Sequence, residues 1–236
     1  MQAIVLAGGL GTRLRSAVPE LPKPLAPVAG RPFLDHVLQW LSENGAGEVV
    51  LAVSYRWRAI RGAFGHRAHG MTLRYSVEQE PLGTGGALVQ AFTELDDDHA
   101  VVVNGDTLFA VDLRAMYRAH IGAGSQLTMA VKHMEDCSRY GRVLMDDAGA
   151  VTGFAEKQAG APGWINGGCY CVARQLFRDH SPGRVFSFEQ DLLQSNVTSI
   201  QPLVCRSDAY FIDIGVPADW QRASAELAGA AVQHGS

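Results

Sequence analysis

Residues 3–14, AIVLAGGLGTRL, decide the fold. The apolar part, residues 3–7, is bounded by glycine and is typical of a strand that is buried on both faces, as in a parallel sheet. Apolar residues at helical spacing follow from Pro32 to Gly45, and residues 48–55 resemble a second buried strand. Because successive strands are separated by a helix, this order predicts an α/β fold with a Rossmann-like, mainly parallel, mixed sheet flanked by helices.

The rest of the chain divides into two patterns. In the first half we expect helices over residues 57–64 and 84–95 and strands over residues 72–77 and 100–104. In the second half short strands predominate, over residues 126–131, 142–145, 151–155, 168–173 and 210–214. Ser187 could cap a helix over residues 188–194, and a last helix begins at Pro217. Few helices separate these later strands, so a smaller mixed or antiparallel insertion is expected.

Composition excludes several classes of protein. Of 236 residues, 47% are hydrophobic and 19% are charged, which excludes disordered, collagen-like and coiled-coil chains and favours one globular domain over residues 1–236. A net charge of −4 argues against a general nucleic-acid binder. The sequence contains no apolar run of about 18 residues and no signal-peptide pattern, so we expect a cytoplasmic protein without a membrane segment. The four cysteines lack zinc or redox spacing and are expected to be reduced thiols.

The glycine-rich loop after the first strand is the first candidate site. Its backbone amides could approach a phosphate or a base, and Arg13 could pair with phosphate oxygens. The loop is neither a dinucleotide-binding fingerprint nor a P-loop, because Leu14 replaces the third glycine and no Gly-Lys-Ser/Thr is present. Lysine is rare in this chain, with 17 of the 20 basic residues being arginine, and Lys23 stands between two rigid prolines. These features favour a functional role for Lys23 and Lys157, and leave the role of Lys132 open.

Two aspartates are candidates for a metal site. Asp106 follows an apolar strand and Asp213 lies within another apolar run, so both are expected near a sheet edge. A buried carboxylate needs a cationic partner, and Mg²⁺ accepts one or two carboxylates together with substrate phosphates. A helix cap or an ion pair with arginine is the alternative for each aspartate.

Seven stretches of the chain resemble the motifs of the sugar-1-phosphate nucleotidyltransferases, in the order of that family. They are residues 8–14, 22–28, 80–86, 103–107, 154–157, 165–168 and 211–217. The resemblance covers nearly the whole chain and implies the family's glycosyltransferase-A-like fold. It also implies a nucleotide-binding half at about residues 1–110 and a sugar-phosphate-binding half at about residues 111–236. Residues 1–4, 52–55, 139–141 and 186–189 are most similar to members that act on GTP and a heptose 1-phosphate.

The reaction that the resemblance implies needs no covalent intermediate. A sugar 1-phosphate attacks the α-phosphorus of a nucleoside triphosphate and pyrophosphate leaves, with Mg²⁺ as cofactor. The implied catalytic residues are Arg13, Lys23, Asp106, Lys157 and Asp213, of which Asp106 and Asp213 would bind the metal. The implied nucleotide contacts are Leu6, Ala7, Gly8, Gly9, Gly11, Thr12, Arg13, Lys23, Gln79, Glu80, Gly83, Thr84, Asn104, Gly105 and Asp106. The implied sugar-phosphate contacts are Gly141, Glu156, Lys157, Asn166 and Gly167.

Base identity is the least determined point. A carboxylate can accept hydrogen bonds from two adjacent donors of guanine, which makes Glu80 a candidate, although an exposed loop acid is nearly as good an interpretation. The alternatives are a uridylyl- or thymidylyltransferase acting on another sugar 1-phosphate, and a non-catalytic binder of nucleotide-sugars. The product would serve bacterial surface polysaccharide synthesis, and a homodimer is left open.

Overall fold

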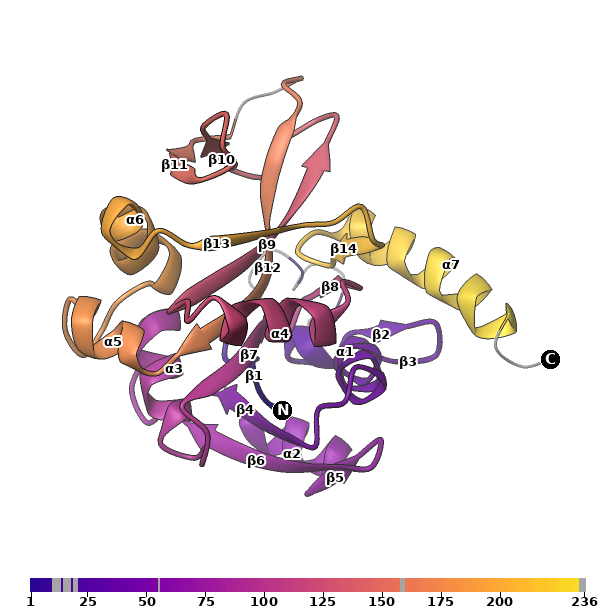
Figure 1. The fold of residues 1–236 in the computed structure, drawn as a ribbon. Coiled ribbons are helices and arrows are strands. Elements are labelled where there is room, and N and C mark those ends of the chain that lie inside the picture. The colour runs from indigo at the N-terminus through magenta and orange to yellow at the C-terminus, as the bar shows by residue number, and fades with distance from the viewer. Residues whose placement is uncertain (10–13, 15–17, 19–20, 55, 158–159, 234–236) are drawn as a thin grey trace.

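A ten-stranded mixed sheet runs through the computed structural model, which describes residues 1–9, 14, 18, 21–54, 56–157 and 160–233 (Figure 1). Its strands are β1 (Gln2–Leu6), β4 (Glu48–Val53), β5 (Arg67–Ala68), β6 (Met71–Val77), β7 (His99–Asn104), β9 (Leu127–Met134), β10 (Arg142–Met145), β11 (Val151–Ala155), β12 (Gly163–Ala173) and β13 (Leu203–Arg206). Two short pairs lie beside it, β2 (Pro27–Val28) with β3 (Arg31–Pro32), and β8 (Thr107–Phe109) with β14 (Phe211–Asp213).

The central strands β7, β1, β4 and β6 are parallel neighbours. Residues of β1 are buried on both faces, because Ala3 and Val5 belong to one apolar cluster and Ile4 to the other. This double burial explains the continuous apolar run that the sequence shows there. The predicted mainly parallel α/β fold is therefore confirmed.

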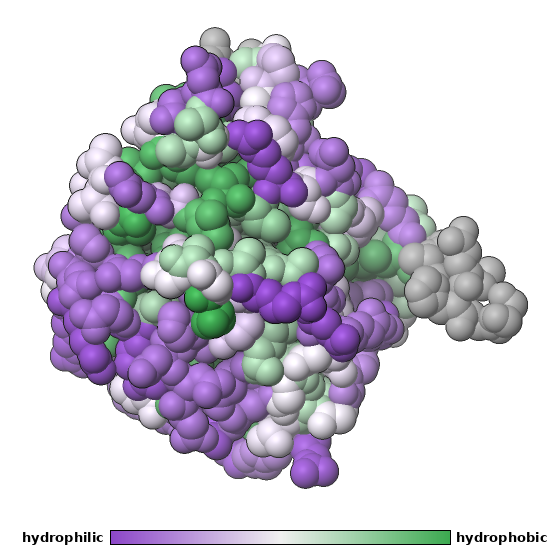
Figure 2. All heavy atoms as spheres, viewed as in Figure 1, coloured by the Kyte–Doolittle hydropathy of each residue, from purple (hydrophilic) through white to green (hydrophobic). Residues whose placement is uncertain are grey.

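Helices cover both faces of the sheet (Figure 1). They are α1 (Phe33–Glu43), α2 (Trp57–Phe64), α3 (Gly83–Phe92), α4 (Leu113–Gly122), α5 (Gln175–His180), α6 (Ser195–Ile200) and α7 (Pro217–Gln233), with the 3₁₀-helix η1 (Lys23–Leu25) and the π-helix η2 (Phe188–Gln194). In α1, Leu34, Val37 and Leu41 recur at helical spacing and are fully buried. Figure 2 shows the same face of the molecule in space-filling form; most of it is hydrophilic, and apolar residues gather in the middle. Among the described residues, no helix has the length and apolarity to cross a bilayer.

The second half differs from the sequence prediction. The strands expected to form an insertion extend the main sheet instead, because β12 pairs antiparallel with β7 and carries β10 and β9. β12 begins at Gly163 rather than at residue 168, and β8, β13, α4 and α5 were not predicted. The signal for α4 was present, because the Asp112 side chain caps it by accepting from the Ala115 amide at 2.9 Å.

The structure also bears on the predicted Ser187 cap and on the cysteines. Ser187 caps η2, because its hydroxyl oxygen accepts from the Gln190 amide at 3.1 Å, although the segment is a π-helix and not an α-helix. All four cysteines are free thiols. Cys169 and Cys171 both pack into the same apolar cluster on one face of β12, as their alternation along the chain indicates.

Candidate functional site

Two cavities open at the carboxyl ends of the central strands. One, of about 420 Å³, lies against the ends of β1 and β4 and the start of α3. The other, of about 640 Å³, lies between β12, β11, η2 and β14. They share three lining residues, Lys23, Asn104 and Asp106. The carboxyl edge is where ligands of open α/β sheets bind, so the junction of the two cavities is the natural place for a reaction between two ligands.

The smaller cavity is formed by backbone and small side chains. Gly8 lies against Glu78, since a Cβ atom at Gly8 would sit 2.8 Å from Oε1 of that carboxylate. Ser54 holds this loop by donating to the Gly8 carbonyl at 2.6 Å. The Leu82 amide donates to Oε2 of Glu78 at 2.9 Å, and burial of Glu78 raises the pKa of its carboxyl. Beside β1, the cavity therefore presents the Glu78 carboxylate and a glycine backbone to a ligand.

Most of the described residues predicted for nucleotide binding line this cavity. They are Leu6, Ala7, Gly8, Gly9, Lys23, Gly83, Thr84, Asn104 and Asp106. Gly105 instead joins two strand ends, its amide donating to the Leu6 carbonyl at 2.9 Å. Gln79 and Glu80 are exposed and are not among the lining residues, whereas Glu78, which the sequence analysis missed, is. Gly11, Thr12 and Arg13 lie outside the described residues.

Lys23 stands at the junction of the cavities. Pro22 and Pro24 are both buried and bracket it in the single turn of η1, so the backbone is fixed as the sequence indicates. Its ammonium group pairs with Asp106 and lies 3.7 Å from Oδ1 of Asp213. Asp106 follows β7, whereas Asp213 ends β14, which reaches the same place by pairing with β8. The two carboxylates are thus brought together by non-local strand pairing.

The groups around Asp213 have opposing effects on the pKa of its carboxyl. Burial and the neighbouring charge of Asp106 raise the pKa of the Asp213 carboxyl, while Lys23, the Gly215 amide and Arg139 oppose the increase. The Gly215 amide donates to Oδ1 at 2.6 Å, and a guanidinium nitrogen of Arg139 lies 3.8 Å from Oδ2. Two carboxylates that face one ammonium group would be stabilised by a further cation.

The donor set matches magnesium chemistry in part. Within the described part of the chain, no three His, Cys, Asp or Glu side chains form a group that could hold a metal. Asp106 and Asp213 supply two carboxylates, which is the usual protein contribution to a magnesium ion whose other ligands are water and substrate phosphates. The residues therefore fit a metal that arrives with a nucleotide.

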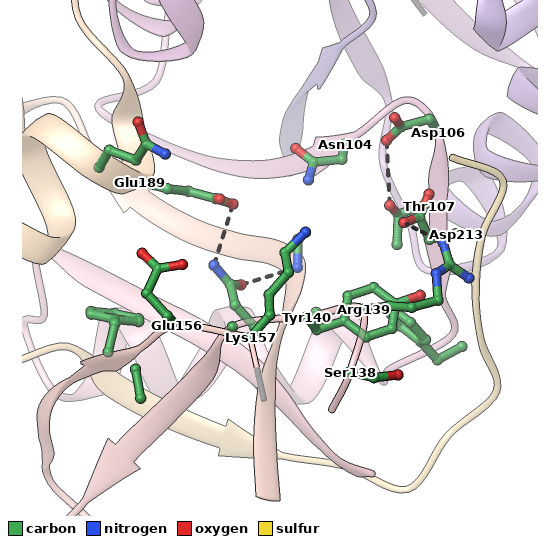
Figure 3. A pocket seen from close by; sticks show the side chains of 18 of the residues that line it. Asn104, Asp106, Thr107, Ser138, Arg139, Tyr140, Glu156, Lys157, Glu189 and Asp213 are labelled. Atoms are coloured by element: carbon green, nitrogen blue, oxygen red, sulfur yellow. Dashed lines mark hydrogen bonds and ion pairs between the residues drawn. The ribbon is translucent and has the colours of Figure 1, made fainter. Parts of the chain in front are cut away.

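The larger cavity contains all five residues predicted to bind the sugar phosphate. They are Gly141, Glu156, Lys157, Asn166 and Gly167. Figure 3 shows Lys157 extending between Glu189 on one side and Asp106 and Asp213 on the other. Glu156 and Lys157 are exposed to this open space at the end of β11. Lys132 is not among the lining residues, and its ammonium group donates to the carbonyls of Asp208 and Ala209 at 2.9 and 2.8 Å, which is a structural role.

Further lining residues were missed by the sequence analysis. Thr107, Ser138, Arg139, Tyr140, Glu189, Gln190 and Gln194 are polar side chains of this kind. Arg139 and Glu189 belong to stretches that carried the resemblance, so a signal existed without a role attached. Arg139 also pairs with Asp219 of α7, which ties the last helix to the edge of the cavity.

Comparisons with known proteins identify the family of this chain. The family described as Nucleotidyl transferase matches residues 2–229. D-glycero-alpha-D-manno-heptose 1-phosphate guanylyltransferase of Aneurinibacillus thermoaerophilus is 46% identical, covering 96% of this chain and 98% of that protein. The enzyme of the same name from Campylobacter jejuni is 42% identical, covering 93% and 97%. The crystal structure of HddC from Yersinia pseudotuberculosis complexed with GMP-PN superimposes with a TM-score of 0.85 at 31% identity, covering 96% and 99%.

Proposed function

Since this chain belongs to the nucleotidyl transferase family, we propose that it transfers GMP from GTP to D-glycero-α-D-manno-heptose 1-phosphate, forming GDP-heptose and pyrophosphate. The observation that carries the proposal is the pair of adjoining cavities that share Lys23, Asn104 and Asp106. The chain is 46% and 42% identical, over nearly its full length, to two D-glycero-alpha-D-manno-heptose 1-phosphate guanylyltransferases, and this supports the choice of substrates. The product would enter bacterial surface polysaccharide synthesis, and the enzyme would work in the cytoplasm.

The reaction is a single displacement at phosphorus. An ionised oxygen of the sugar 1-phosphate forms a bond to the α-phosphorus, and the bond from that phosphorus to the bridging oxygen breaks, so that pyrophosphate leaves with the electron pair. The nucleophile carries no proton that must be removed. Catalysis therefore consists of placing the two phosphates in line and neutralising their charge.

Lys23 would take part in this at the junction, and the support for that role is that Lys23 lines both cavities. Lys157 would hold the sugar phosphate in the larger cavity, and Glu156 and Asn166 would bind sugar hydroxyls. Asp106 and Asp213 would hold Mg²⁺, which when bound neutralises the triphosphate and orients its α-phosphate. Arg13 is proposed to bind the triphosphate with Lys23.

Guanine recognition is proposed to involve the smaller cavity. Glu78 lines it and its Oε1 atom lies against Gly8, so a carboxylate is available to accept from the two donors on the Watson–Crick edge of guanine. Uracil and thymine present only one such donor. This makes Glu78 a stronger candidate than Glu80, whose side chain is exposed beside the cavity.

A pyrophosphate-release assay tests the proposal. The full-length protein with Mg²⁺ is offered GTP, ATP, UTP, CTP or dTTP, each with heptose 1-phosphate, mannose 1-phosphate or glucose 1-phosphate. We expect the highest kcat/KM with GTP and the heptose. A preference for UTP or dTTP overturns the guanylyl assignment, and release with no pair of substrates overturns the enzymatic function.

A further inference from the structure

Glu189 is a charged residue of the larger cavity to which the proposed reaction gives no task. It is the second residue of η2, and it lines the same cavity as Lys23 and Asp106 of the junction. Figure 3 shows Glu189 on one side of the space and Asp106 and Asp213 on the other. Short π-helical segments occur frequently at functional sites, so the position warrants a chemical explanation.

A buried tyrosine fixes the Glu189 carboxylate. Tyr170 of β12 is only 1% exposed, and its hydroxyl donates to Oε1 of Glu189 at 2.6 Å. The side-chain amide of Asn166 donates to the Tyr170 hydroxyl at 2.6 Å and reaches the same Glu189 oxygen at 3.3 Å. Burial and the charge of Glu189 raise the pKa of Tyr170 well above its ordinary value, so its hydroxyl remains a donor near neutral pH.

The segment that carries Glu189 is itself held in place. The Phe188 amide donates to the Thr84 hydroxyl at 2.9 Å, and the Gly85 amide donates to the Phe186 carbonyl at 2.9 Å. Gly85 must be glycine for this contact, because a Cβ atom there would sit 2.1 Å from the Phe186 ring. The start of α3 is thus bonded both to η2 and to the residues that lead into it, although they lie far apart in the sequence.

These contacts leave one oxygen of Glu189 for a ligand. Among the described residues, the hydrogen bonds to this carboxylate reach Oε1 alone. Oε2 belongs to a side chain that lines the cavity and can accept further hydrogen bonds. A carboxylate held at one oxygen by two donors, with its second oxygen able to accept, is suited to bind hydroxyl groups, which are the donors that a sugar offers.

The direction of the sugar follows from the junction. Its 1-phosphate must reach the α-phosphorus near Lys23 and Asp106, so the other end of the sugar extends toward η2. We infer, on the basis of the proposed function, that Glu189 binds hydroxyl groups at the end of the sugar farthest from the 1-phosphate. Tyr170 is a positioning residue, because it acts through the orientation of Glu189.

Three variants of the full chain test this inference. Glu189→Gln keeps an acceptor for Tyr170 and removes the charge, Tyr170→Phe removes only the hydroxyl, and Glu135→Gln is the matched control on a side chain that is 94% exposed. Steady-state kinetics are measured with the better of heptose 1-phosphate and mannose 1-phosphate, varied at saturating GTP, and then with GTP varied. Melting temperatures show whether each variant is folded.

We expect Glu189→Gln to raise KM for the sugar phosphate about tenfold, because a charge-assisted hydrogen bond becomes a neutral one. Tyr170→Phe should raise the same KM about threefold through a less ordered carboxylate, and neither variant should change KM for GTP by more than about twofold. Glu135→Gln should match the wild type.

Two results overturn the inference while the proposed function stands: an unchanged KM for the sugar phosphate in folded Glu189→Gln, or an equal rise in KM for GTP and for the sugar phosphate. An inactive wild type overturns the proposed function, and the inference with it.

Discussion

Lys23→Met gives the most direct test of the junction between the two cavities. Methionine keeps an unbranched side chain as far as Cε and removes the ammonium group that faces both Asp106 and Asp213. In the variant, the two carboxylates repel one another without a cation between them. The folded state should lose stability, and turnover should fall because the charge shared by both cavities is lost.

The separation of the charges sets the magnitude. At 3.7 Å, the distance from Lys23 Nζ to Asp213 Oδ1, the attraction between unit charges is about 4.5 kcal/mol at an effective dielectric constant of about 20. The side chains of Lys23 and Asp213 are 13% and 23% exposed, so solvent weakens the pair. We therefore expect a loss of about 2–3 kcal/mol, below the 3–5 kcal/mol of fully buried pairs. For a domain of this size the melting temperature should fall by about 4–12 °C.

A double-mutant cycle isolates the interaction. Unfolding by urea is measured in metal-free buffer for the wild type, Lys23→Met, Asp213→Asn and the double variant. The change in the free energy of unfolding caused by Asp213→Asn should be more stabilising in the Lys23→Met protein than in the wild type, and the difference is a coupling energy of about 2 kcal/mol. Lys132→Met, whose ammonium group bonds to backbone carbonyls, is the control and should be additive with Asp213→Asn. Additivity within about 0.5 kcal/mol for Lys23 as well would refute the pairing.

Four further predictions concern single sites. Asp106→Asn and Asp213→Asn should each abolish pyrophosphate release in a folded protein, and a near-wild-type rate would remove that residue from the metal site. Because the pKa of Asp213 is raised in the folded state, its protonated carboxyl adds stability below its ordinary pKa, and this stability is lost as pH rises through the raised pKa. The melting temperature of Asp213→Asn should therefore be higher than that of the wild type at neutral pH, and the two melting temperatures should converge in acid. A difference in melting temperature that does not depend on pH contradicts this. Lys157→Arg should raise KM for the sugar phosphate, because a planar guanidinium group replaces a compact ammonium group, whereas Lys132→Arg should leave this KM unchanged. Equal kinetics for the wild type and Lys157→Arg would show that the scarcity of lysine does not indicate a functional role for Lys157. Glu78→Gln should narrow the GTP-to-UTP ratio of kcat/KM about tenfold and Glu80→Gln should leave it unchanged, with the reverse result returning base recognition to Glu80.

Local patterns in the sequence determined the framework of this protein. The apolar run of β1 and the helical spacing of apolar residues in α1 reflect burial of each segment, whichever partner it packs against. Both elements could therefore be predicted. The rigidity of Lys23 could likewise be predicted, because proline restricts the backbone without help from distant residues. The position of Asp106 near a sheet edge could also be predicted locally, because Asp106 follows a buried strand.

Tertiary structure decided which of these residues meet. Asp213 reaches Asp106 only because β14 pairs with β8, and strand partners are chosen by packing across the whole chain, which no local pattern encodes. Glu78 lines the cavity and Glu80 does not, since the direction of each side chain depends on how the chain leaves β6 and enters α3. Glu189 gains its fixed orientation from Tyr170 on another strand. The sequence therefore determined the types of residue available for chemistry, and long-range packing determined their partners and directions.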